Sequence, residues 1–205
     1  MKDVRVVAFD CDGVLFDTAQ SNRAYYNEIL NHFGRPNLTP EQFAYVHMHT
    51  LEESLAYLFG DKKDLAEVYA YRKTMNYDDF LKLMKLEPEL IPLINKIRPQ
   101  KKTAIATNRT DTIIELIREF GLNGYFDLVV TSTDVKFPKP NPDPLLKILE
   151  HFRIEADQAI YVGDSHLDEL AATSAGIALV AYRNRSLSTA YHIDSLKELE
   201  AILGA

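Results

Sequence analysis

The sequence is poor in cysteine, lacks long apolar runs and carries fewer basic than acidic residues. Its single cysteine excludes an intramolecular disulfide framework. No stretch approaches the roughly 20 apolar residues that a membrane-spanning helix needs. With 23 Lys and Arg against 30 Asp and Glu, the net charge of −7 argues against a general nucleic-acid binder, which needs a basic face. Since the first residues also show no signal-peptide pattern, we expect a cytoplasmic protein that has neither nucleic acid nor membrane as a partner.

The stretch from Val6 to Thr18 organises the rest of the chain. An apolar, β-branched run ends abruptly in Asp10 and Asp12, and Gly13 follows. Such a run predicts a buried strand, and because strand side chains alternate, the two aspartates are expected to point the same way. Two carboxylates at the end of a buried strand repel each other and are costly to desolvate. The pattern therefore indicates a cation site or a catalytic pair; a strand that ends in a polar turn without chemistry is the alternative.

Helical periodicity dominates the chain from Thr18 to Lys85. Four helices without a strand are expected there, and Thr39-Pro40-Glu41-Gln42 is typical of a capped helix start. The last helix is expected to run from about Leu65 to Leu81 or Leu83. This segment, residues 18–85, is predicted to be an inserted helical domain.

From Pro88 onward, predicted helices and strands alternate. Such alternation predicts a parallel sheet with helices on both faces, a Rossmann-like α/β core formed by residues 1–17 and 86–205. Ligands in such sheets bind at the carboxyl ends of the strands. The expected strands after the first are 103–107, 128–130, 159–162 and, as the last, 177–180. The expected helices are 90–97, 111–120, 145–152, 166–175 and one that a capping box opens at Ser195.

Polar residues follow two of these strands. Thr107 and Asn108 can bind a phosphate group together with helix amides, or simply cap the next helix. Asp164 ends a buried strand and Asp168 lies one helical turn later on the same face. This pair suits a hard divalent cation such as Mg²⁺, although helix capping by Asp164 or Ser165 is the alternative.

A proline-rich segment, residues 136–144, precedes the helix at 145–152. Prolines hold Lys139 at the helix start, where an ammonium group can neutralise carboxylate and phosphate charge; a solvated lysine in a stiff loop is the alternative. Three neighbouring residues are expected to have no role in chemistry. Arg109 and His166 are expected on the surface, and Cys11 as a small buried hydrophobe.

Together these segments resemble the four motifs of the haloacid dehalogenase (HAD) superfamily, in order. Asp10-x-Asp12-Gly13-Val14-Leu15-Phe16-Asp17-Thr18 is similar to the first motif of its phosphatase branch. Thr107-Asn108 resembles the second motif, in the form found in phosphoglycolate-phosphatase-like members. Lys139-Pro140-x-Pro142-Asp143 resembles the third motif. Gly163-Asp164-Ser165-x-x-Asp168 resembles the fourth motif. The third motif selects Lys139 over Lys136, because the functional lysine there precedes the first proline. The insert resembles the family's α-helical cap of the first type.

The resemblance implies a Mg²⁺-dependent phosphatase that hydrolyses a small phosphorylated metabolite, such as a phosphoglycolate-like monoester, through an aspartyl-phosphate. An aspartate at position 12 favours phosphate esters, since members that act on carbon–halogen bonds or phosphonates lack it. The alternatives are a sugar phosphomutase or other phosphotransferase with the same motifs, and a non-catalytic phosphate-ligand binding protein. An intact Asp10/Asp12 pair argues against the non-catalytic protein. The sequence leaves the physiological substrate and the oligomeric state open.

By the same resemblance, each motif residue has an expected role. Asp10 is the nucleophile and Asp12 the general acid and base. Thr107, Asn108 and Lys139 hold the phosphoryl group. The metal ligands are Asp10, the backbone carbonyl of Asp12, Asp164, and Asp168 as a ligand or as support. Substrate choice is expected to depend on the cap, with Tyr25, His47, His49, Arg72 and Lys73 as candidates.

Overall fold

The computed structural model describes residues 3–60, 62–98, 100–110 and 112–204. The chain divides into two compact units. One combines Met1–Phe16 with Leu86–Ala205, and the other is Asp17–Lys85. The division falls inside two short paired strands, β2 (Phe16–Asp17) and β3 (Lys85–Leu86), where the chain leaves the first unit and returns to it.

The first unit is built on a parallel sheet whose strand order, over the described residues, is β5-β4-β1-β6-β7-β8. Strand β1 (Val6–Phe9) lies between β4 (Lys102–Ala106) and β6 (Ala159–Gly163). Because the chain extends the sheet from β1 first towards β4 and later towards β6, the carboxyl ends of these strands meet at the topological switch point. The remaining strands are β5 (Leu128–Val130), β7 (Ala178–Tyr182) and β8 (Tyr191–Ile193).

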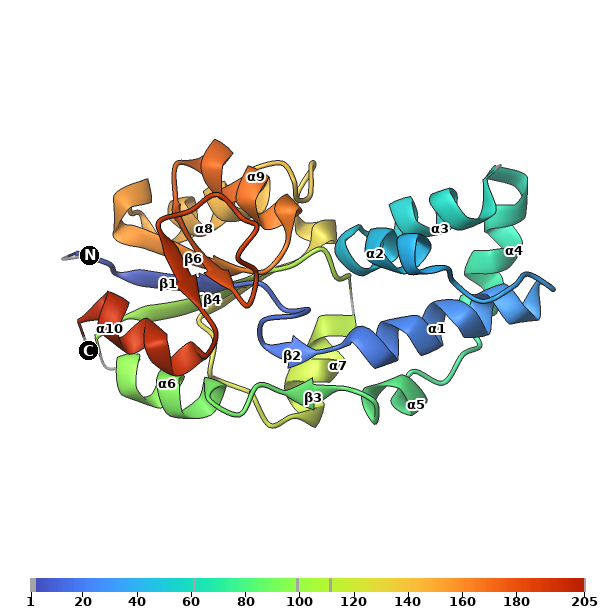
Figure 1. Cartoon of the computed structure of the whole chain (residues 1–205), viewed down its shortest axis with the longest axis horizontal. Coiled ribbons are helices and arrows are strands. Elements are labelled where there is room, and N and C mark those ends of the chain that lie inside the picture. The colour runs from blue at the N-terminus through green and yellow to red at the C-terminus, as the bar shows by residue number, and fades with distance from the viewer. Residues whose placement is uncertain (1–2, 61, 99, 111, 205) are drawn as a thin grey trace. The chain divides into compact units, whose positions relative to one another are not determined.

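Helices cover both faces of this sheet (Figure 1). Helices α8 (Asp143–Phe152) and α9 (His166–Ala175) lie on one face, and α6 (Leu90–Ile97), α7 (Thr112–Glu119) and α10 (Leu199–Leu203) lie on the other. The central strands are buried along their length, which explains their nearly continuous apolar sequence. The predicted α/β fold with a parallel sheet is therefore confirmed.

The second unit is helical over its described residues between the two short strands. It contains α1 (Ala19–His32), α2 (Pro40–Met48), α3 (Leu51–Phe59), α4 (Lys62–Arg72) and α5 (Asp78–Leu81). The predicted helix start at Thr39 is confirmed, because its hydroxyl accepts from the Gln42 amide and the Gln42 side chain accepts in return from the Thr39 amide. Ile29, Leu55 and Val68 are fully buried in the core of this unit.

The helix expected from Leu65 to Leu81 or Leu83 is wrong, because two helices occupy this range. Helix α4 ends at Arg72 and α5 begins at Asp78. Between them, the Asn76 side chain accepts a hydrogen bond from the Asp78 amide at 3.3 Å. Nearer the end of α4, the Thr74 hydroxyl donates to the Tyr71 carbonyl at 2.7 Å. Such local side-chain bonds compete with the helical pattern.

The described residues also form more strands than the sequence predicted. Strand β7 is not the last, because β8 follows it at the edge of the sheet. Lys85, expected within the helical segment, belongs to β3. Strands β2 and β3 have two residues each, and β8 carries the polar His192 at its centre, so none of them gives a short apolar run like the one that predicted β5.

Candidate active site

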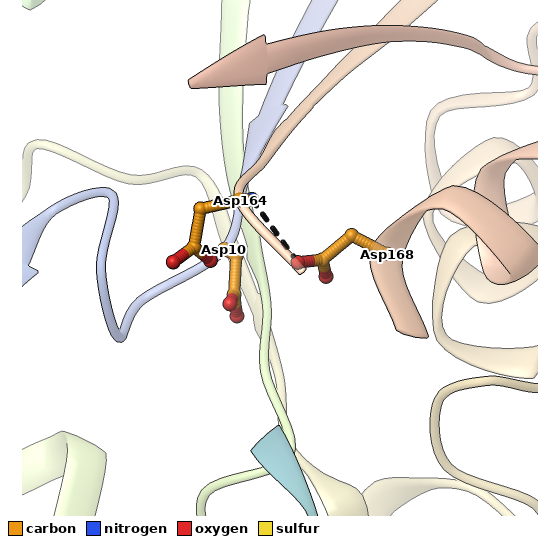
Figure 2. A group of neighbouring side chains, drawn as sticks. All are labelled: Asp10, Asp164 and Asp168. Atoms are coloured by element: carbon orange, nitrogen blue, oxygen red, sulfur yellow. Dashed lines mark hydrogen bonds between the residues drawn. The ribbon is translucent and has the colours of Figure 1, made fainter. Parts of the chain in front are cut away.

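Three carboxylates converge at the carboxyl end of the sheet (Figure 2). Asp10 directly follows β1, Asp164 follows β6, and Asp168 lies in the first turn of α9. One oxygen of each lies within 4.8 Å of the others. The structure thus brings together three predicted residues that are far apart in the sequence.

Lys139 lies inside this acidic group. Its Nζ donates to Asp10 Oδ1 and to Asp168 Oδ1, each at 2.7 Å, and to the Tyr161 hydroxyl at 3.0 Å. The side chain is 3% exposed, so the expected choice of Lys139 over the exposed Lys136 agrees with its position. Burial works against the charged form, but the two carboxylates outweigh burial and raise the pKa of Lys139.

Asn108 fixes the backbone at Lys139. Its side-chain Nδ2 donates to the Lys139 carbonyl at 3.0 Å, and its Oδ1 accepts from the Lys139 amide at 3.1 Å. This pair of bonds ties the end of β4 to the proline-rich segment, whose Lys139-Pro140 peptide is cis. The geometry makes Asn108 a positioning residue for Lys139; its contact with phosphate stays a prediction.

Asp168 is fully buried and organises the turn between β6 and α9. Its Oδ2 accepts from the Asp164 amide at 3.2 Å, the Ser165 amide at 3.0 Å and the Ser165 hydroxyl at 2.6 Å. Its Oδ1 is held by Lys139 and by the Tyr161 hydroxyl, both at 2.7 Å. Burial alone would raise the pKa of Asp168, but these partners lower it. With both oxygens engaged, the geometry favours support of the site over direct metal ligation.

Asp10 and Asp164 are the carboxylates best placed for a cation. Burial raises the pKa of Asp10 to about 7, against the opposing effect of Lys139. Burial and the neighbouring carboxylates of Asp168 and Asp10 also raise the pKa of Asp164 well above its usual value. A cation between these carboxylates would offset their mutual repulsion, and hard oxygen donors suit Mg²⁺. The site therefore fits a divalent metal by its donor chemistry.

Two glycines allow this close approach. Gly13 has φ of +81°, and a Cβ there would lie 2.6 Å from Asp164 Cγ. A Cβ at Gly163 would lie 2.5 Å from Asp168 Cβ. Any larger residue at either position would push a carboxylate out of the cluster.

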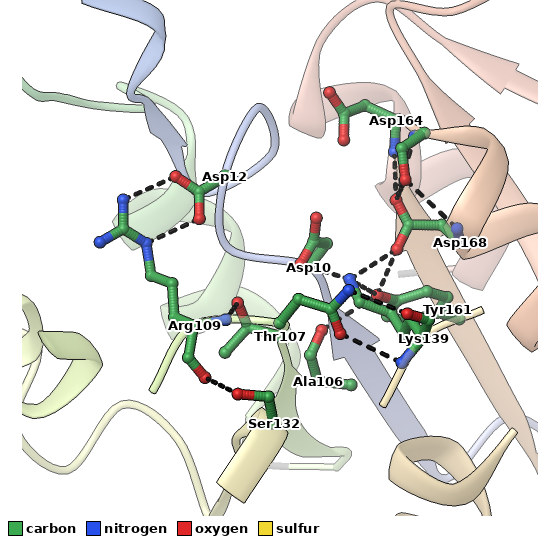
Figure 3. A network of polar contacts seen from close by, with 12 residues as sticks. Asp10, Asp12, Ala106, Thr107, Arg109, Ser132, Lys139, Tyr161, Asp164 and Asp168 are labelled. Carbon is green, nitrogen blue, oxygen red and sulfur yellow. Dashed lines mark hydrogen bonds and ion pairs between the residues drawn. The ribbon is translucent and has the colours of Figure 1, made fainter. Parts of the chain in front are cut away.

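The Asp12 carboxylate turns towards Arg109 (Figure 3). Arg109 Nε donates to Asp12 Oδ2 at 2.6 Å and Nη2 donates to Oδ1 at 2.7 Å, a two-pronged ion pair. The side chains are 9% exposed for Arg109 and 14% for Asp12. The expectation that Arg109 lies on the surface is therefore wrong. A sequence pattern cannot show that a carboxylate 97 positions away neutralises it.

Thr107 directly follows β4 and lies next to Arg109 in the site. It is 1% exposed, and its hydroxyl accepts from the Arg109 amide at 3.1 Å. Tyr161 is a site residue that the sequence analysis missed. It is the one side chain of β6 with a hydroxyl, and this polar group in an otherwise apolar buried strand was the available signal.

Several remaining expectations can be compared with the structure. Cys11 is fully buried and His166 is exposed, both as predicted. Four of the cap candidates make side-chain contacts within the second unit. His47 Nδ1 lies 3.0 Å from Asn22 Nδ2, His49 Nδ1 lies 2.9 Å from the Tyr45 carbonyl oxygen, and Arg72 Nε donates to the Tyr25 hydroxyl at 2.7 Å. Their contacts with substrate stay predictions. In the part of the chain that the structure describes, no helix is long and apolar enough to cross a membrane.

Known proteins resemble this chain over nearly its whole length. The pyrophosphatase PpaX of Bacillus velezensis is 29% identical over 206 residues, which cover 97% of this chain and 94% of that protein. A solved HAD-superfamily hydrolase of subfamily IA, variant 1, from Geobacter sulfurreducens is 35% identical, with a TM-score of 0.80. That match covers 99% of this chain and 98% of the other.

The structure of CbbY from Rhodobacter sphaeroides, solved in complex with phosphate, has a TM-score of 0.81 and covers 96% of each chain. At 23% identity this likeness shows the fold alone. The family profile described as haloacid dehalogenase-like hydrolase matches residues 7–182, which include all four motif segments. The chain therefore belongs to the haloacid dehalogenase-like hydrolase family, as its motifs predicted.

Proposed function

We propose that this protein is a Mg²⁺-dependent phosphatase that transfers the phosphoryl group of a small metabolite to Asp10 and then to water. The observation that carries the proposal is the setting of Asp10. Lys139 holds its Oδ1, and the described hydrogen bonds leave Oδ2 available for attack. Asp164 lies beside it as a second anionic donor. A fixed carboxylate with one available oxygen is suited to nucleophilic catalysis.

The metal would be held by the side chains of Asp10 and Asp164 and by the backbone carbonyl of Asp12. When bound, Mg²⁺ would polarise the phosphoryl oxygens and offset their charge. Asp168 supports this arrangement through its bonds to the Asp164 amide and to Lys139.

The reaction has two displacements at phosphorus. In the first, an Asp10 oxygen forms a bond to phosphorus while the bond to the leaving oxygen breaks, and Asp12 gives that oxygen a proton. In the second, water attacks the aspartyl-phosphate and Asp12 takes a proton from it, which releases phosphate and restores Asp10. Lys139 and the Thr107 hydroxyl would stabilise the charge on the transferred group.

Two phosphate compounds are the first substrates to test. The sequence favours a phosphoglycolate-like monoester, whereas the curated relative at 29% identity is named a pyrophosphatase. The second unit, Asp17–Lys85, would select between such substrates. Substitution of His47 or Arg72 by alanine should then change the order in which substrates are preferred, while an unchanged order would argue against this role.

A phosphate-release assay over a panel of phosphorylated metabolites tests the function. We expect release with Mg²⁺, none in excess chelator, and recovery when Mg²⁺ is restored. Asp164→Ala should raise the Mg²⁺ concentration needed for half-maximal rate, whereas the exposed Asp157→Ala serves as a control. Full activity without metal would contradict the proposal.

The same assay separates the alternatives. A phosphomutase would move phosphate between substrate hydroxyls and release little of it. A binding protein would neither release phosphate nor form a phosphoenzyme.

A further inference from the structure

The backbone of Asp164 determines where its carboxylate points. Over the described residues, no group donates a hydrogen bond to either side-chain oxygen of Asp164. The direction of this carboxylate therefore depends on the two peptide groups that flank the Asp164 Cα atom. Whatever holds these peptides also holds the proposed metal ligand in place, and this argument rests on the proposed function.

Both flanking peptides are held by side chains. Asp168 Oδ2 accepts from the Asp164 amide at 3.2 Å (Figure 2) and from the Ser165 amide at 3.0 Å. From the other side, Asn184 Nδ2 donates to the Asp164 carbonyl at 2.7 Å. The peptide between Asp164 and Ser165 is thus held at its N–H and at its carbonyl at once. Asp168 belongs to the fourth motif, whereas Asn184 belongs to none of the four.

Asn184 lies in the segment that follows β7, and this segment is anchored at several points. The Asn184 Oδ1 accepts from the Ser186 amide at 3.0 Å and from the Ser186 hydroxyl at 2.6 Å, which fixes the side-chain amide. Leu187 is buried in the core of the first unit. The Ser188 amide donates to Glu169 Oε1 at 3.0 Å, so the segment is also bonded to the first turn of α9.

The residue before Asn184 has an unfavourable backbone. Arg183 has φ of +50°, in the left-handed region that residues with a Cβ rarely occupy. Its amide donates to the Ile193 carbonyl at 2.8 Å and its Nε donates to the Asp194 carbonyl at 2.9 Å, which hold this conformation. Strained residues persist where surrounding contacts fix them, and they cluster at functional sites. Here the strained turn leads from β7 directly into the residue that bonds the Asp164 carbonyl.

We propose that Asn184 is a positioning residue for the metal site. Its hydrogen bond to the Asp164 carbonyl keeps the Asp164 carboxylate in the acidic cluster with Asp10. Without this bond, the peptide after Asp164 is held at one end only, and the backbone can tilt and carry the carboxylate away. Groups that orient a metal ligand typically contribute about 10- to 100-fold to metal affinity. The proposal thus gives the segment after β7 a role in metal binding.

Metal binding in the absence of substrate tests this role. Mn²⁺ prefers the same oxygen ligands as Mg²⁺, and the electron paramagnetic resonance signal of the free ion reports its affinity without turnover. Asn184→Ala removes the donor. Asn184→Asp keeps the shape of the side chain and the acceptor for Ser186, but it places a carboxylate oxygen where the donor was. Ser186→Ala is the matched control, because it removes a hydrogen bond of the same segment and leaves the bond to Asp164 in place.

We expect Asn184→Ala to weaken Mn²⁺ binding by about 10- to 100-fold and Ser186→Ala to leave it unchanged. Asn184→Asp should also weaken binding, although an added negative charge by itself favours a cation, and this variant serves if Asn184→Ala does not fold. Wild-type affinity in either Asn184 variant, or an equal loss in Ser186→Ala, would overturn the positioning role.

Asp164→Ala separates a failure of this role from a failure of the proposed function. If Asp164→Ala binds Mn²⁺ as tightly as the wild type, the proposed metal site is wrong and the role of Asn184 falls with it. If Asp164→Ala weakens binding and the Asn184 variants do not, only the positioning role is overturned. The expected affinity pattern without phosphate release from any substrate would refute the proposed phosphatase and support the role of Asn184.

Discussion

Replacing Gly13 by alanine should remove activity through Asp164 while leaving the fold intact. The added Cβ would lie 2.6 Å from Asp164 Cγ, far inside van der Waals contact, so the carboxylate must rotate out of the cluster. The φ of +81° adds a backbone cost of about 1–2 kcal/mol for a residue with a Cβ. Gly124 separates these effects. Its φ is +79°, but a Cβ there would meet nothing within 4 Å.

Gly13→Ala and Gly124→Ala should therefore lose similar stability in urea denaturation, but differ in catalysis. A displacement of about 1 Å in a catalytic group can cost about 10²-fold in rate. We expect a loss of at least this size in kcat/KM for Gly13→Ala, with a higher Mg²⁺ requirement, and a near wild-type rate for Gly124→Ala. A Gly13→Ala enzyme with unchanged rate and Mg²⁺ dependence would refute the placement of Asp164 in the metal site.

Two further predictions concern charge in the interior and at the sheet edge. Lys139→Met leaves Asp10 and Asp168 without the ammonium group that pairs with them. The free energy of unfolding, measured by urea denaturation, should therefore fall by about 3–5 kcal/mol. The exposed Lys136→Met is the control and should change it by less than about 0.5 kcal/mol. Equal small effects would show that the buried lysine does not stabilise the fold. At Asp127, burial would raise the pKa, but hydrogen bonds from the Thr103 amide and the Lys102 side chain outweigh burial and lower it. A carboxyl group whose pKa is lower in the folded than in the unfolded state stabilises the fold at pH values above the unfolded pKa of about 3.9. This stabilisation is lost as the pH falls. The destabilisation by Asp127→Asn should therefore be largest near pH 7 and shrink below about pH 4, and a constant difference across this range would contradict the assignment.

Much of the fold could be predicted because its signals are local. The strand at 128–130 and the helices at 90–97 and 166–175 occur at the predicted bounds, since apolar periodicity and turn residues delimit them. Strand β8 and the pair β2–β3 could not be predicted, because pairing with a neighbour rather than their own sequence defines them. The break before α5 contains side-chain hydrogen bonds of Thr74 and Asn76 to the backbone, which are visible only in the structure.

The polar residues of the site were predictable for a different reason. Asp10, Thr107 and Asp164 follow strands whose carboxyl ends must meet in a parallel sheet. The order of the site residues along the chain also matches the family motifs. The predicted enzyme class, a HAD-family phosphatase, is confirmed at the level of the family by the profile over residues 7–182 and by relatives with phosphatase-type names. The partners of these residues were not predictable. Arg109 and Asp12, and likewise Tyr161 and Lys139, are separated in the sequence and are brought into contact by the fold.

The central claim is that Asp10 accepts the phosphoryl group and Asp12 moves the protons, and rapid-quench intact-mass measurement tests it most directly. With an activated aryl phosphate, which needs little protonation of its leaving group, Asp12→Asn should still complete the first displacement. The second step lacks its base, a role worth about 10²–10⁴ in rate, so a phosphoryl adduct should accumulate with a burst of product and little turnover. Asp10→Asn should form neither adduct nor product. A phosphoryl adduct in Asp10→Asn, or none in Asp12→Asn while product still forms, would contradict the mechanism.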